Sequence, residues 1–195
     1  MNYGYFPVSG NWLERLFAEG SIKPPALYRL LTLHNKEEAR RQFNSQKAEL
    51  EAKIEFLQNA ALDRPDMFES MKQEGVNGKY SAAYYIGTHS RDSKLRQLLS
   101  GIDISQYFIM LYTDFNTART VQRVSKQGAV LEIQVPQQVK RHEKLSNIGT
   151  VYLVPEEIPT NKIYKVHAHS IEHARIILEE NGASPELCSL KPNVR

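Results

Sequence analysis

The stretch from Lys36 to Ala61 limits the fold of this chain more than any other segment, because it contains neither glycine nor proline. Its apolar positions at helical spacing are Leu50, Ile54, Leu57 and Ala61. They form one narrow stripe on a single helix, and residues 36–75 carry seven basic and nine acidic side chains. We predict one long helix, ended by Arg64-Pro65-Asp66. It is either a solvated helix lying along the core or a surface that binds a protein partner through residues 36–61.

Signals typical of β-strands gather later in the chain. The segments rich in β-branched, aromatic and aliphatic residues are Tyr80–Ile86, Tyr107–Thr113, Ala129–Val135, Thr150–Val154 and Lys162–Ala168. Helices with recognisable cap residues are expected at Asp92–Ser100, Phe115–Ser125 and Ile171–Glu180. Short helices are expected at 12–17, before Gly20, and at 27–31. This order of elements favours the α+β class.

The same signals divide the chain into three predicted zones. Residues 1–79 form a helical N-terminal region packed on the core, residues 80–182 form the β-rich core, and residues 183–195 form a loose tail. Between residues 90 and 145 there are nine lysines and arginines against five acidic residues. An excess of positive charge in the core suits a pyrophosphate-bearing ligand or an RNA substrate.

Several function classes lose support because their motifs are missing. The sequence has no Walker A loop, no Gly-x-Gly-x-x-Gly, no His-Glu-x-x-His and no Gly-x-Ser-x-Gly. Cys188 is the single cysteine, which excludes a disulfide scaffold and a cysteine-rich metal site. His167 and His169 share one side of a predicted strand, either as metal ligands or as polar residues at a strand end. With no third ligand evident, no metal site is predicted.

Membrane insertion finds no support in the hydropathy pattern. No segment reaches the roughly 18 apolar residues that span a bilayer, and the longest apolar run is Tyr107 to Tyr112. The first residues have neither the basic nor the apolar region of a secretory signal. We therefore expect a cytoplasmic protein, or one delivered into a target cell by a route that needs no signal.

One ordered set of short motifs indicates a specific chemistry. In chain order these are Tyr84-Tyr85-Ile86-Gly87-Thr88, a leucine-bearing helix that stops at Gly101, Ile109 to Asp114, a helix opened by Asn116-Thr117-Ala118, Gly128 to Val135, and Gly149 to Val154 followed by Ile158-Pro159. This order resembles the ADP-ribosyltransferase superfamily, most of all the tRNA 2′-phosphotransferase branch and the diphtheria-toxin or poly(ADP-ribose) polymerase type. The resemblance covers about residues 80–166 and implies a split β-sheet core.

The resemblance implies a site that holds NAD⁺, as substrate, in a bent shape. Gly87 and Thr88 would match the contact with the nicotinamide amide, since glycine has no Cβ to obstruct a close approach. Tyr112 and Thr113 would match the wall of the nicotinamide pocket. Arg91 would meet the phosphates. The reaction passes through an oxocarbenium-like state, which requires anionic or dipolar stabilisation near the ribose.

Two positions depart from the family pattern. Ile86 stands where the family has histidine before Gly-Thr, and His89 is the expected substitute. Ile148-Gly149 stands where many members have the catalytic glutamate. The acids that could serve instead are Glu143 in the preceding loop and Glu156 and Glu157 after the strand, and we select Glu143. The candidate catalytic residues are therefore His89, Glu143 and Tyr112.

Each motif also has a plain structural interpretation. Gly87-Thr88 fits an ordinary turn at a strand end, Tyr112 fits a core position, and Arg141 to Lys144 fits a solvated loop. The motifs together predict an NAD-dependent mono-ADP-ribosyltransferase acting on a protein, RNA or DNA acceptor, of a size that suits a toxin or effector. The alternatives are an RNA 2′-phosphotransferase-like enzyme and a catalytically inactive binding or inhibitory module with helix 36–61 as its partner surface.

Overall fold

The chain folds into two compact units, each assembled from separate stretches of sequence. The computed structural model describes residues 2–62, 64–76, 78–121, 128–139, 142–145 and 149–189. The sheet unit comprises Met1–Lys23, Met110–Lys140 and Glu156–Arg195, and the helical unit comprises Pro24–Ile109 and Arg141–Pro155. The α+β class is confirmed. The boundary predicted at residue 79 falls inside the helical unit, which includes Pro24–Ile109 as one stretch.

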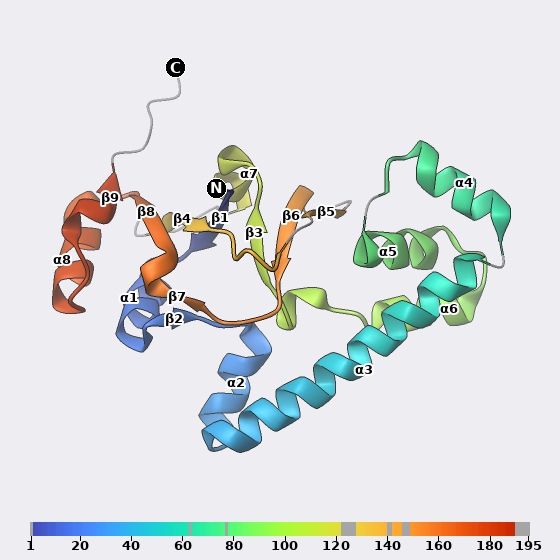
Figure 1. Ribbon diagram of the computed structural model, residues 1–195, viewed down its shortest axis with the longest axis horizontal. Coiled ribbons are helices and arrows are strands. Elements are labelled where there is room, and N and C mark those ends of the chain that lie inside the picture. Colours follow the sequence, from blue (N-terminus) through green and yellow to red (C-terminus); the bar gives the residue numbers. More distant parts are fainter. Residues whose placement is uncertain are drawn as a thin grey trace. The chain divides into compact units, whose positions relative to one another are not determined.

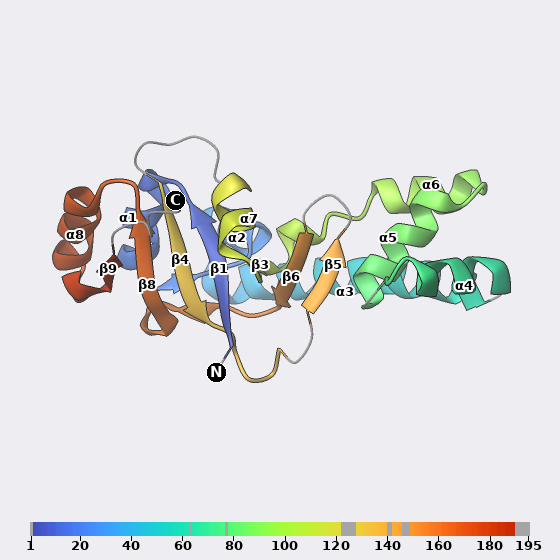
Figure 2. The same cartoon turned by 90° about the horizontal axis from the view of Figure 1, so that it is seen from above.

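The sheet unit is built on strands from all three of its stretches (Figures 1 and 2). The strands are β1 (Tyr3–Val8), β3 (Ile109–Tyr112, in this unit from Met110 on), β4 (Ala129–Gln134), β8 (Ile163–Ala168) and β9 (Cys188–Ser189). Their order is β3-β1-β4-β8-β9. The pairs β1–β3, β1–β4 and β4–β8 are antiparallel, and β8–β9 is parallel. A second, two-stranded sheet pairs β2 (Ser21–Ile22) with β7 (Ile158–Pro159).

Among its described residues the sheet unit also has three α-helices, each with the end signals that the sequence predicts. They are α1 (Gly10–Glu19), α7 (Phe115–Val121) and α8 (Ile171–Glu180), with short 3₁₀ turns at Thr160–Lys162 and Pro185–Leu187. Gly20 ends α1 in the left-handed conformation that glycine adopts most readily, with a φ of 72°. The Ser170 side chain caps α8 by accepting the His173 N–H. The C-terminal part of the helix predicted at Phe115–Ser125 lies outside the described residues.

The alternation of side chains gives this sheet two different faces. The apolar face buries residues such as Leu111, Leu131, Ile133 and Val166. The opposite face, which we call the polar face, carries the partly exposed Tyr5, Glu132, Gln134, Lys165 and His167. Side chains at paired positions of antiparallel strands lie on the same face. Polar groups from β1, β4 and β8 therefore meet there.

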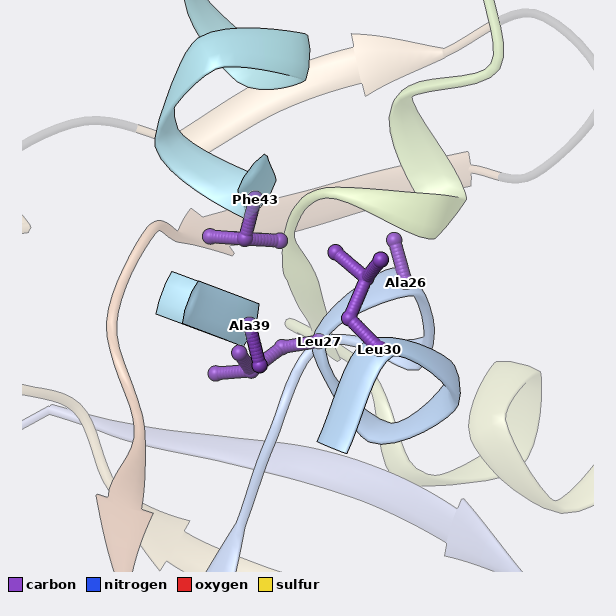
Figure 3. Packing of buried hydrophobic residues seen from close by; sticks show 5 residues of the cluster. All are labelled: Ala26, Leu27, Leu30, Ala39 and Phe43. Atoms are coloured by element: carbon purple, nitrogen blue, oxygen red, sulfur yellow. The ribbon is translucent and has the colours of Figure 1, made fainter. Parts of the chain in front are cut away.

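The helical unit consists of five α-helices, one 3₁₀ turn and one hairpin within its described residues. The helices are α2 (Pro25–Leu33), α3 (Lys36–Leu62), α4 (Pro65–Gln73), α5 (Lys79–His89), α6 (Ser93–Ser100) and the 3₁₀ turn η1 (Ile104–Gln106). The antiparallel hairpin joins β5 (His142–Leu145) and β6 (Gly149–Val154). Figure 3 shows the buried contact between α2 and α3, formed by Ala26, Leu27, Leu30, Ala39 and Phe43.

The long helix predicted from the sequence is confirmed as α3, with 27 residues. The apolar stripe is its buried side, because Leu50, Ile54 and Leu57 are at most 4% exposed. A one-sided helix gains its stability from burying such a stripe. The side chain of Ala61 lies outside the described residues.

The strand predicted at Tyr80–Ile86 is wrong, because these residues form the middle of helix α5. The helix contacts α3, α4, α6 and β5. Its buried residues Tyr80, Ala83, Tyr85 and Ile86 therefore lie on several sides rather than on one. The apolar residues of a helix packed on several sides do not recur with a 3.6-residue period. Its aromatic and β-branched residues therefore predicted a strand.

Candidate functional site

Gly87 serves helix packing in this structure, which corrects its expected position at the end of a strand. A Cβ on Gly87 would lie 2.6 Å from the Cβ of Leu99 on α6. Glycine is therefore required here so that α5 and α6 can approach one another. The neighbouring Thr88 hydroxyl lies 2.9 Å from the carbonyl oxygens of Tyr84 and Tyr85, which is back-bonding within the helix.

Glu143 caps helix α5 from another element, and it is not part of a solvated loop. It is 8% exposed and lies on strand β5. One carboxylate oxygen accepts the backbone N–H groups of Tyr80 and Ser81, each at 2.9 Å. These donors belong to the first turn of α5, which has no hydrogen-bond partners within the helix. Gly78, at a φ of 102°, has no room for a Cβ beside the Glu143 side chain.

The environment of Glu143 favours its protonated form despite those two hydrogen bonds. Burial raises the pKa of the Glu143 carboxyl above its ordinary value of 4.5. The amides of Ser81 and Tyr80 and the charge of Lys79 act in the opposite direction and compensate only in part. This glutamate therefore holds two elements of the helical unit together, and its capping oxygen is already saturated with donors.

The remaining predicted residues divide between the two units. His89 and Arg91, at the end of α5, are exposed and belong to the helical unit with Gly87 and Thr88. Tyr112 and Thr113, at the end of β3, belong to the sheet unit. Tyr112 is 4% exposed, and burial raises the pKa of its phenol, so the hydroxyl stays protonated at neutral pH. The predicted set is therefore not assembled within either unit.

The polar face of the sheet unit brings together a carboxylate, an imidazole and aromatic rings. The Nε2 of His167 lies 3.0 Å from Oε2 of Glu132, and their side chains are 10% and 17% exposed. The Phe115 ring stands edge-on to both His167 and Tyr5, with centroid distances of 4.9 and 5.6 Å. Tyr112 of β3 pairs with Tyr5 and thus belongs to the same face.

Local sequence explains why these groups meet. In β4, Glu132 and Gln134 alternate with the buried Leu131 and Ile133, which is the period of a strand with one core face. Tyr5 of β1 lies directly opposite Glu132 in the ladder. The turn between β3 and α7 is fixed by the N-terminal cap of α7, which the sequence predicts at Asp114. One oxygen of Asp114 accepts the backbone N–H and hydroxyl of Thr117 at 2.6 and 2.8 Å.

The electrostatics of this face concern mainly Tyr5 and Glu132. Burial raises the pKa of the Tyr5 phenol, and the charges of Glu132 and Asp114 raise it further. Because a carboxylate only accepts hydrogen bonds, the Nε2 of His167 carries the hydrogen toward Glu132. Glu132 is therefore held by His167 and lies opposite the protonated Tyr5, and the ring of Phe115 contacts both of these residues.

Sequence reasoning missed Tyr5, Glu132 and Phe115 as site residues. A glutamate on the non-core side of an apolar strand is a weak signal, since most such residues only face solvent. The aromatic residues Tyr3 and Tyr5 alternate in the first eight positions, but this segment was expected to belong to a helical region. Once β1 is recognised as a strand beside β4, Tyr5 and Glu132 fall opposite each other.

The described part of the chain has neither a cluster of metal-ligating side chains nor a helix that could span a membrane. No group of three or more histidine, cysteine or acidic side chains is arranged to hold a metal ion there. His167 binds Glu132, and the backbone N–H of His169 binds the Gly128 carbonyl at 3.0 Å. No helix among these residues combines the length and the hydropathy needed to cross a membrane.

Comparison of the chain with known protein families, with curated proteins and with solved structures finds no match in any of the three.

Proposed function

We propose that the sheet unit carries an NAD⁺-dependent ADP-ribosyl transfer site on its polar face, centred on Glu132. The supporting observation is the Glu132–His167 hydrogen bond of 3.0 Å beside Tyr5 and Phe115. Transfer of a glycosyl group needs a negative charge next to the carbon that becomes cationic. The oriented and partly exposed carboxylate of Glu132 meets that need, whereas Glu143 is buried and engaged as a helix cap.

In the proposed reaction the bond between the ribose C1′ and the nicotinamide nitrogen breaks, and its electron pair leaves with nicotinamide. Glu132 stabilises the positive charge that develops on the ribose. The acceptor nucleophile then forms a bond to C1′ and releases its proton to solvent. The products are ADP-ribosylated acceptor, nicotinamide and a proton. His167 is a positioning residue, because it holds the carboxylate and does not itself react.

The same face offers groups that suit the other parts of NAD⁺. The half-buried Tyr5 and the ring of Phe115 provide flat apolar surface for nicotinamide. The resemblance assigns Tyr112 and Thr113 to the pocket wall, and Tyr112 is the last residue of the neighbouring strand β3, with Thr113 directly after it. Lys165 lies directly opposite Glu132 on β8 and supplies a positive charge for the pyrophosphate.

The test uses NAD⁺ labelled in the adenosine part and follows both hydrolysis and transfer to protein, RNA and DNA acceptors. We expect the wild-type chain to release nicotinamide and Glu132→Gln to lose this activity. Glu179→Gln, an exposed glutamate of α8 in the same unit, is the matched control and keeps it. The absence of nicotinamide release and of NAD⁺ binding by calorimetry in the wild-type chain would exclude the proposal.

A second candidate is a catalytically inactive binding or inhibitory module. The observation that favours it is the structural use of Gly87 and Thr88 within helix α5, since the resemblance assigned these two residues to the nicotinamide contact. In that case NAD⁺ binds without release of nicotinamide, and His167→Ala does not change this.

A 2′-phosphorylated oligonucleotide added with NAD⁺ tests the phosphotransferase alternative in the same assay.

A further inference from the structure

A cavity of about 260 Å³ lies wholly within the helical unit, and none of its lining residues belongs to the polar face of the sheet unit. Its lining residues are Glu74, Val76, Ser81, Tyr84, Tyr85, Thr88, His89 and Lys144. Five of them come from one side of α5 and its last turn, two follow α4, and one lies on β5. The volume is slightly below the roughly 300–1,000 Å³ of sites for drug-sized ligands, which points to a smaller ligand.

The cavity holds one acidic and one basic group that do not neutralise each other. Glu74 accepts the Tyr85 hydroxyl at 3.1 Å but forms no ion pair with any described residue. Lys144 is exposed, and within the described part of the chain its ammonium group forms no hydrogen bond or ion pair. A site with separated charges of both signs favours a ligand that also carries both signs. A singly charged ligand is attracted by one of the two groups and repelled by the other.

His89 adds an oriented acceptor to the wall of this cavity. Its Nδ1 lies 2.9 Å from the backbone carbonyl oxygen of Tyr85, and a carbonyl oxygen only accepts. The Thr88 hydroxyl oxygen also lies 3.0 Å from Nδ1, and this hydroxyl donates to backbone carbonyls of the helix. With the hydrogen on Nδ1, the neutral ring donates to the Tyr85 carbonyl and presents the lone pair of Nε2. The ring is fixed by stacking on Tyr85, with centroids 4.0 Å apart and planes at 18°. An ammonium group can thus be accepted by Nε2 as well as by the Glu74 carboxylate.

We propose that this cavity binds a free α-amino acid with an aromatic or large apolar side chain. The ammonium group lies at Glu74 and His89, and the carboxylate lies at Lys144. The side chain packs against Val76 and Tyr84, the latter being 36% exposed. This site is independent of the proposed transfer reaction, because no residue of the polar face takes part in it.

Nuclear magnetic resonance titration of the full chain with L-phenylalanine tests the proposal. We expect the amide signals of Tyr84, Thr88 and Lys144 to shift in a saturable manner. N-acetyl-L-phenylalanine and L-phenylalanine amide each lack one charge, and both should bind on the order of tenfold more weakly than the free amino acid. Equal binding of the blocked analogues, or no saturable shift at millimolar concentration, overturns the proposal.

Variants that still fold distinguish a loss of ligand binding from a general loss of structure. Glu74→Gln keeps an oxygen that accepts the Tyr85 hydroxyl, and Lys144→Gln removes an exposed charge, so both should fold. Each should weaken binding of L-phenylalanine on the order of tenfold. Lys94→Gln, an exposed lysine of α6 in the same unit, is the matched control and should not. If the three variants bind alike, the charges do not recognise the ligand.

Discussion

Glu132 of the sheet unit and Glu143 of the helical unit are both carboxylates on β-strands, but their surroundings differ in kind. Glu132 retains 17% of its side-chain exposure and is held by one imidazole. Glu143 is more deeply buried and binds two backbone amides at a helix terminus. Deeper burial and two backbone donors commit Glu143 to the helix terminus, whereas the more exposed Glu132, with one side-chain donor, remains accessible to a ligand. The comparison teaches that the partners of an acid, more than its position in a motif, indicate whether it serves structure or chemistry.

The largest expected effect tests the chemical side of this comparison. Glu132→Gln should lower NAD⁺ turnover at least about 100-fold, equivalent to about 2.7 kcal/mol of transition-state stabilisation. Glu143→Gln should leave turnover within about twofold of the wild type, because its amide oxygen still accepts both N–H groups. Steady-state assays of nicotinamide release measure both variants. A larger loss in Glu143→Gln than in Glu132→Gln would reverse the assignment.

The structural side of the comparison predicts a large loss of stability from truncation of Glu143. Glu143→Ala should lower the free energy of unfolding by about 3 kcal/mol, because it leaves the Tyr80 and Ser81 N–H groups buried without an acceptor. Glu132→Ala should cost less than about 1 kcal/mol, since the His167 imidazole remains within reach of water. Urea denaturation followed by circular dichroism gives both values. Equal losses would mean that the two carboxylates play similar parts.

Gly87 provides a test of the packing assigned to α5. Gly87→Ala introduces a Cβ 2.6 Å from the Cβ of Leu99, so α5 and α6 must separate. We expect a loss of about 2 kcal/mol in the free energy of unfolding, despite the better helix propensity of alanine. Leu99→Gly removes the clashing Cβ, so Gly87→Ala should cost less in a Leu99→Gly background than in the wild-type chain. An alanine at 87 that stabilises the chain would contradict the close approach.

The smallest expected effect is a dependence of stability on pH that comes from Glu143. Its pKa is raised by folding, so the native state binds this proton more tightly than the unfolded chain does. The contribution to stability is complete below pH 4.5 and declines as the pH rises from there through the raised value. Glu143→Gln removes this decline, whereas Glu132→Gln keeps it. Thermal unfolding between pH 4 and 8 measures the difference.

The sequence predicts those elements whose period reflects a single buried side. Helix α3, strands β4, β6 and β8, and the caps Asp114 and Ser170 follow from local spacing and chemistry. Helix α5 does not, because its contacts on several sides erase the period. Strand β5 was expected to be a loop, since its charged residues acquire a role only beside α5.

The candidate site is harder to predict than the elements that carry it. Tyr112 and Thr113 at the end of β3 follow from sequence, but Tyr5 and His167 join Glu132 only through the register of β1, β4 and β8. Strand pairing joins residues more than a hundred positions apart, and no local pattern encodes it. The resemblance assigned Gly87 and Thr88 to a strand end, and only tertiary packing shows them to be helical.

The way the two units share the chain has a practical consequence for fragment work. The backbone passes between the units four times, after residues 23, 109, 140 and 155. One proteolytic cut at any of these points leaves both units tethered by the remaining connections. Neither unit exists as one continuous segment that could be expressed alone. An isolated sheet unit requires Lys23 to be joined to Met110 and Lys140 to Glu156 by two engineered linkers.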